Sequence, residues 1–215
     1  RISTLTFAVI NIDTFWENIM LNKFFFGILI FSLGLLSTPA VQAHSLLLDQ
    51  NLWLTGFIHP WQGLDHILAM IAIGLWAAQQ GAQRLWQVPV AFVSILLVAA
   101  IVGLNGYQLA YVESGISSSL LIMGLMLAFA IRLSIFPSLL MVGLFALFHG
   151  YAHAIEMPQT SNMIVYANVY GFMFSSCILL GLGVVLGQLC RDQLKQTLLR
   201  FGGLAIGFTG VWLWI

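Results

Sequence analysis

Long apolar stretches alternate with short polar breaks along most of this chain. Stretches of roughly 20 residues, the length with which a helix crosses the hydrocarbon of a bilayer, recur after residue 50. The breaks between them are rich in glutamine, arginine, glycine and proline. Because a helix satisfies its own backbone hydrogen bonds in lipid, the pattern predicts an all-α integral membrane protein with six transmembrane helices. The six spans are expected near residues 52–78, 88–110, 116–132, 137–155, 163–189 and 198–215.

A shorter apolar stretch precedes these six. Lys23 stands before an apolar run over residues 24–36, and small residues follow at Val41-Gln42-Ala43. A positive charge, a short apolar run and a small-residue site are the three parts of a secretory signal peptide. We therefore expect cleavage after Ala43. The alternative is a first helix that is retained, although the run is short for a full span.

This expectation divides the chain into an upstream part, a signal peptide and a membrane domain. Met20 is the expected initiator, so that residues 1–19 are an upstream over-extension and residues 20–43 the signal peptide. The six-helix domain then covers residues 44–215 and begins at His44. A free amine beside an imidazole can bind a metal ion, so we count His44 as a possible ligand.

The distribution of charge predicts the orientation in the membrane. Cleavage of a signal peptide leaves the mature N-terminus outside, which assigns every later break to one side. All lysines and arginines after the signal peptide then fall on the inner side, as the positive-inside rule requires. We expect a multi-pass membrane protein with its mature N-terminus outside, which in a bacterial inner (plasma) membrane is the periplasmic side. The five basic residues are Arg84, Arg132, Arg191, Lys195 and Arg200.

Composition agrees with a membrane environment and excludes some functions. Hydrophobic residues make up 60% of the 215 residues and charged residues 7%, whereas soluble domains carry about 25% charged residues. The net charge is zero, so no basic field is available to bind nucleic acid. Cys177 and Cys190 are thirteen residues apart, a spacing that indicates neither a disulfide nor a CxxC metal site.

The candidate chemistry begins with a histidine cluster in the first span. His59 and His66 are seven residues apart and Met70 follows four residues later, so on a helix the three share one stripe. Asp65 precedes His66 and can either bind a metal ion or orient the His66 ring as a hydrogen-bond acceptor. A proline and a glycine between the two histidines weaken the helix and can free carbonyl groups toward a cavity.

A second cluster lies in the fourth span. His149, His153 and Glu156 follow the spacing i, i+4, i+7 and therefore share one helix face. The expected orientation places both clusters in the outer half of the membrane, where ionisable residues are costly and usually functional. Imidazoles and carboxylates suit Ni²⁺, Co²⁺ or Zn²⁺. The absence of a thiolate from both clusters argues against Cu(I), although Met70 leaves that ion open.

These two clusters resemble the motifs of the HupE/UreJ family, the hydrogenase and urease accessory membrane proteins. The first motif reads His59-Pro60-x-x-Gly63-x-Asp65-His66 with Met70 after it, and the second reads Phe148-His149-Gly150-x-Ala152-His153-x-x-Glu156. The resemblance extends over residues 20–215 and departs at Ala154, where the family usually has glycine.

The resemblance implies a secondary permease for nickel or cobalt that supplies hydrogenase, urease or cobalamin synthesis. The metal ion is then the transported substrate and no cofactor is permanently bound. A homo-oligomer stays open, as does the choice between the two metals. The implied functional positions are His59, Asp65, His66, His149, His153 and Glu156.

Two other functions remain as alternatives. An intramembrane hydrolase could use zinc to activate water, but no HExxH motif is present because Gly150 follows His149. The chain could instead bind metal as an accessory protein without transporting it. No Walker A sequence occurs, so we do not expect the chain to hydrolyse ATP.

Overall fold

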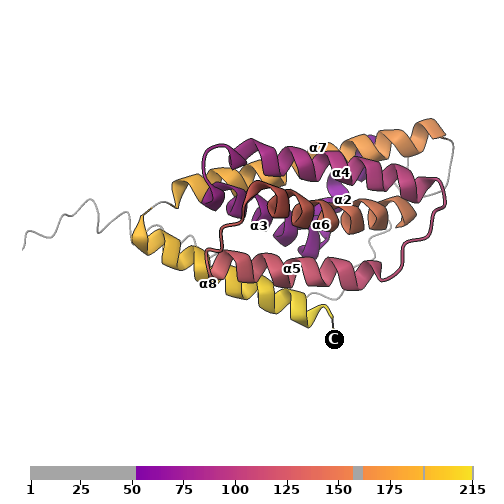
Figure 1. The fold of residues 1–215 in the computed structure, drawn as a ribbon. Helices are drawn as coiled ribbons and strands as arrows, with labels where there is room; N and C mark the ends of the chain where they lie inside the picture. Colours follow the sequence, from indigo (N-terminus) through magenta and orange to yellow (C-terminus); the bar gives the residue numbers. More distant parts are fainter. Residues whose placement is uncertain (1–51, 157–161, 191, 215) are drawn as a thin grey trace, which may run out of the picture. The chain divides into compact units, whose positions relative to one another are not determined.

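The computed structural model describes residues 52–156, 162–190 and 192–214, and these residues are helical without any strand. This confirms the expected all-α class for the described part of the chain. The predicted upstream segment, signal peptide and His44 lie outside the described residues. Figure 1 shows the helices, which are α2 (Leu52–Gln62), α3 (Leu64–Gln80), α4 (Arg84–Leu104), α5 (Val112–Ala128), α6 (Ile135–Glu156), α7 (Asn162–Leu189) and α8 (Gln193–Trp212).

Helix α3 is the central element of the bundle. It packs against α7 along much of its length and also contacts α4 and α5, while α4 lies along α6 and α5 lies along α8. The shorter α2 also packs on α7. Met70, Ile73 and Trp76 on α3 are fully buried. The first turn of α3 is partly buried, and His66 is the buried residue in it.

Glycines bring several helix pairs into backbone contact. A Cβ atom added at Gly74 on α3 would lie 2.9 Å from the Cα atom of Gly183 on α7. Gly150 on α6 faces the backbone oxygen of Leu96 on α4 in the same way. Such close approach is typical of helix packing in membranes, where small residues maximise van der Waals contact. These contacts hold α7 against α3, which carries His66, and hold α6, which carries His149 and His153, against α4.

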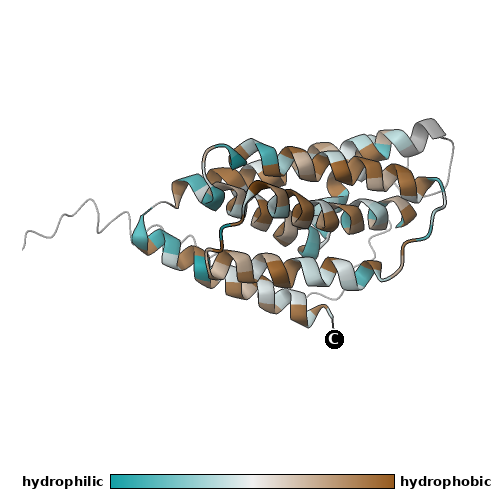
Figure 2. Cartoon of the chain, in the orientation of Figure 1, coloured by the Kyte–Doolittle hydropathy of each residue, from teal (hydrophilic) through white to brown (hydrophobic). Residues whose placement is uncertain are grey.

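Hydrophobic residues occupy much of the length of the helices (Figure 2). On the outside of the bundle, α4, α6 and α7 expose Val98, Leu144 and Phe174. By length and composition, α4, α6 and the Tyr166–Leu189 part of α7 are able to cross a bilayer. Helix α5 is apolar but shorter, and α8 carries Lys195 and Arg200 in its first half. These features are those of a multi-pass membrane protein.

The first expected span is interrupted at Gly63. The sequence indicated only that a proline and a glycine weaken the helix in this region. The backbone at Gly63 is extended, with φ −99° and ψ 119°, and separates α2 from α3. Pro60 lies in the last turn of α2 and has no N–H to continue the helical ladder. The assumption of one continuous helix through His59 and His66 was therefore wrong. The second expected span also ends earlier, at Leu104, because the chain turns at Gly106 with φ +79°.

Hydrogen bonds hold the connection between α5 and α6 at the end of the bundle away from His149. The Trp76 Nε1–H and Gln80 Nε2–H groups both donate to the Ile131 oxygen, at 3.0 and 2.9 Å. The Arg84 guanidinium donates to the Leu133 oxygen at 3.1 Å. Three described basic residues, Arg84, Arg132 and Arg200, thus gather at this end, the latter two around one cavity.

Substitution of Gly183 by alanine should separate α7 from α3. The new methyl group would meet the Ile71 oxygen and the Cα atom of Gly74, and overpacking of this kind costs about 1–3 kcal/mol. We expect a lower melting temperature in detergent, measured by the loss of helical circular dichroism. Gly181→Ala is the matched control, because nothing lies within 4 Å of a Cβ atom there. Equal melting temperatures for both variants would contradict the proposed contact.

Candidate metal centre

Helix α6 places two histidines inside the bundle, one turn apart. His149 and His153 are 0% and 1% exposed. The His149 Nδ1–H group donates to the Phe145 oxygen at 2.9 Å. Because a carbonyl oxygen only accepts, this bond assigns the proton to Nδ1 and leaves the lone pair on Nε2. That Nε2 atom is buried and has no hydrogen-bond partner.

The first turn of α3 supplies a third ring in a similar state. The Nδ1–H group of His66 donates to Oδ1 of Asp65 at 2.9 Å. Its Nε2 atom is buried without a partner. A carboxylate that accepts from one ring nitrogen while the other faces a metal is the usual support of a histidine ligand. The structure therefore fits Asp65 as the residue that orients His66.

His153 lies between the rings of the first motif. Its ring centroid is 4.3 Å from that of His66 and 4.6 Å from that of His59. Neither of its ring nitrogens has a hydrogen-bond partner. The ring of Phe172 on α7 packs against it with the centroids 3.7 Å apart. His153 is thus positioned by packing alone.

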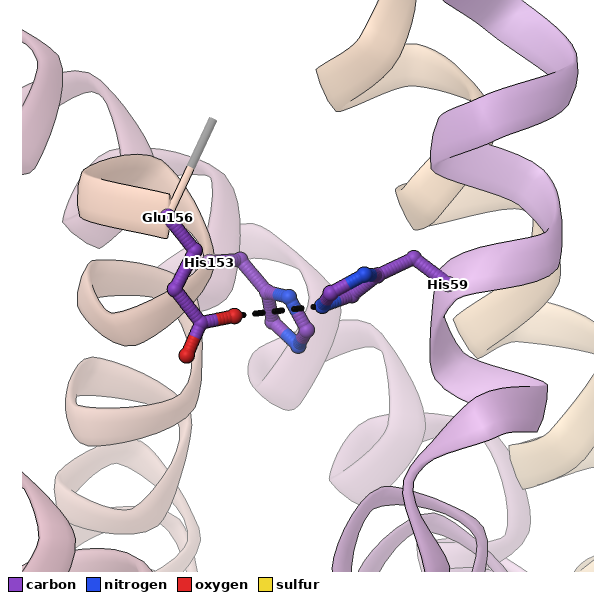
Figure 3. A group of neighbouring side chains, drawn as sticks. All are labelled: His59, His153 and Glu156. Carbon is purple, nitrogen blue, oxygen red and sulfur yellow. Dashed lines mark ion pairs between the residues drawn. The ribbon is translucent and has the colours of Figure 1, made fainter. Parts of the chain in front are cut away.

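The open side of the cluster contains an imidazole and a carboxylate. His59 Nε2 lies 3.3 Å from Glu156 Oε2, and the two side chains are 39% and 51% exposed. Figure 3 shows the His153 ring beside this pair. His153 extends from α6, whereas His59 extends from α2. One donor atom from each of the three residues lies within 4.8 Å of the others. These three could therefore hold a metal ion with little rearrangement.

The buried nitrogens indicate what this cluster can bind. Leaving a buried acceptor or donor unsatisfied costs about 1–3 kcal/mol for each group, and His66, His149 and His153 all have such nitrogens. A divalent transition metal accepts electron pairs from imidazole nitrogens and would satisfy those that reach it. The chemistry of the donor set, imidazole and carboxylate, suits an ion of the Ni²⁺, Co²⁺ and Zn²⁺ group.

Six of the residues named from the sequence lie together in this cluster, namely His59, Asp65, His66, His149, His153 and Glu156. Met70 is fully buried on α3 one turn after His66, and His44 lies outside the described residues. The sequence did not reveal the contribution of α7, where Phe172 packs on His153, or of Phe92 on α4, whose ring centroid is 6.2 Å from that of His149. An aromatic residue in an apolar helix carries no signal that distinguishes it from its neighbours.

This chain is similar to known proteins over most of its length. The family model described as "HupE / UreJ protein" matches residues 31–213. The curated protein "Protein HupE" from Rhizobium leguminosarum bv. viciae is 36% identical over 179 residues, which cover 83% of this chain and 93% of that protein. No solved structure matches.

Asp65→Asn should weaken metal binding without removing a ligand from the buried set. Loss of such a supporting carboxylate typically lowers metal affinity about 10- to 100-fold, and we expect this for Co²⁺ titrated into the purified protein. Glu113→Gln is the matched control, because Glu113 is an exposed carboxylate in the first turn of α5. Unchanged affinity in Asp65→Asn would show that its contact with His66 does not support a metal ligand.

Proposed function

Because this chain belongs to the HupE/UreJ family, we propose that it is a secondary transporter that takes up divalent nickel or cobalt across the bacterial inner membrane. The ion would pass through the cluster of His59, Asp65, His66, His149, His153 and Glu156 and supply a metalloenzyme or cofactor pathway such as hydrogenase, urease or cobalamin synthesis. The ion is the substrate of this protein, and we propose no permanently bound cofactor and no catalytic reaction.

One observation carries this proposal. Three rings from two helices, those of His66, His149 and His153, meet inside an apolar bundle with nitrogens that lack partners. Histidines that only stabilise a helix contact would be expected to hydrogen-bond across it. The position of the cluster also supports passage, since exposure falls from His59 and Glu156 to the buried rings.

The sidedness follows from the two ends of the bundle. Arg84 contacts Ser138 near the start of α6, whereas His153 and Glu156 lie in its last turns. Since basic residues favour the cytoplasmic side, the histidine end would face the periplasm. We propose six spans, with α2 and α3 together forming the first and α8 the last. The break at Gly63 lies beside the cluster, as in transporters whose binding sites are formed by discontinuous helices.

The driving force would come from the membrane rather than from ATP, since no Walker A sequence is present. A charge that moves inward through the membrane potential gains about 2.3 kcal/mol per 100 mV, hence about 4.6 kcal/mol for a divalent ion. A site of imidazoles and carboxylates also favours release. Its ligands compete with protons, and it lacks the thiolates that make closed structural zinc sites persistent.

Proteoliposomes test this function directly. The chain from His44 onward is reconstituted and the entry of radiolabelled Ni²⁺ and Co²⁺ is followed under an inward-negative potential. We expect saturable uptake of at least one ion, and loss of at least 90% of it, about the effect of 1.4 kcal/mol, in His66→Ala and in His149→Ala. Gel filtration verifies that both variants fold, and Glu113→Gln serves as the control with normal uptake.

Two results would contradict the proposal. Absence of uptake of both ions by a folded protein would exclude a permease, and normal uptake by both histidine variants would exclude the cluster as the path. Tight metal binding without uptake would favour a non-transporting accessory protein. Zinc-dependent turnover of a lipid or peptide would favour a hydrolase.

A further inference from the structure

We propose that the transported ion occupies two successive positions in this cluster and that His153 is a ligand in both. The outer position is formed by His59, Glu156 and His153, and the inner position by His66, His149 and His153. This inference rests on the proposed transport function and adds to it a defined sequence of steps, in which one ion is handed inward by a single imidazole.

The distances separate the two positions. A ring nitrogen lies about 2.0–2.1 Å from a bound metal, so the centroids of two rings in adjacent positions on one ion are roughly 4–5.5 Å apart. His153 meets this condition with His59 at 4.6 Å and with His66 at 4.3 Å, and His66 meets it with His149 at 5.5 Å. His59 and His66 are 6.2 Å apart, so these two rings could share one ion only from nearly opposite sides of it, whereas the donor atoms of His59, His153 and Glu156 already lie within 4.8 Å of one another.

The environments of the two positions also differ. The outer donors include an exposed carboxylate, Glu156, which could hold an ion that still keeps part of its water. The inner nitrogens of His66 and His149 are buried, so an ion there would have exchanged more water for imidazole. Asp65 remains near this position through its bond to His66 and would offset the charge of an ion that has left Glu156.

His153 differs from the other buried rings in that no hydrogen bond fixes its orientation. Hydrogen bonds to Asp65 and to the Phe145 oxygen fix the rings of His66 and His149. Both ring nitrogens of His153 are without a partner, and its neighbour on α7 is the apolar ring of Phe172. No hydrogen bond must break when the His153 ring reorients. A neutral imidazole has one lone pair, so His153 can serve only one ion at a time.

A double-mutant cycle with Co²⁺ as the probe tests this arrangement. Equilibrium dialysis measures Co²⁺ affinity in the purified full chain and in Glu156→Gln, His149→Gln and the double variant. With two alternative positions, each single variant keeps the other position, so its affinity should fall only about threefold, whereas the double variant should lose at least about 100-fold. His153→Gln removes a ligand from both positions and should lower the affinity more than either single change. Uptake into proteoliposomes should fail in both single variants because the ion must pass through both positions.

Two controls accompany the cycle. Glu113→Gln repeats the carboxylate-to-amide change at an exposed site on α5, and Ser176→Ala removes a buried polar group on α7. Both should bind and transport normally. Melting temperatures in detergent verify folding, and His149→Asn replaces His149→Gln if the latter is unstable.

The outcomes distinguish this inference from the proposed function. If each single variant loses more than about tenfold in affinity and the two losses multiply in the double variant, one ion contacts Glu156 and His149 together. Two successive positions would then be wrong while uptake by the unaltered chain would still establish a transporter. If the unaltered chain binds Co²⁺ with the expected non-additivity but does not transport it, the two positions stand and transport fails.

Discussion

The main constraint on this structure is that several imidazole nitrogens remain without hydrogen-bond partners inside an apolar bundle. Hydrogen bonds within each helix satisfy the backbone there, but a buried polar side chain without a partner opposes folding. His66, His149 and His153 carry this cost together. The packing of the surrounding helices must therefore exceed it. Buried residues such as Phe92 on α4 and Phe172 on α7 supply that packing close to the rings.

The interruption at Gly63 and the glycine contacts serve the same end. With α2 and α3 as separate helices, His59 and His66 belong to different segments, and each can approach α6 without the fixed spacing of one continuous helix. Gly150 stands between the two histidines of α6 in the sequence and allows α6 to touch the Leu96 oxygen on α4. Close backbone contact around the cluster leaves its rings little room to move, and His153 is held by packing against Phe172 rather than by a hydrogen bond.

The sequence predicted the helical class and the residues of the cluster, because apolar length and histidine spacing are local properties. It did not predict where α4 ends or that α2 and α3 separate, since these depend on single backbone conformations at Gly106 and Gly63. The partnership of His59 with Glu156 was also beyond the pattern. Spacing shows which residues share a helix face, but only the packing of α2 against α7 and of α4 along α6 decides which faces meet.

A transporter must bind its metal ion selectively and also release it. Some of the proposed ligands here are fixed by hydrogen bonds and others are not, and this mixture would reconcile the two requirements. A site whose ligands were all fixed would hold an ion in one place and slow its departure, whereas a site with none fixed would lose affinity to the entropy of ordering them. Here Asp65 and the Phe145 oxygen fix two inner rings, while Glu156 is half exposed and His153 has no hydrogen bond. In the proposed transporter, the fixed rings would select for imidazole-binding metals. Glu156 and His153 would pass the ion between coordination sets without leaving it unliganded.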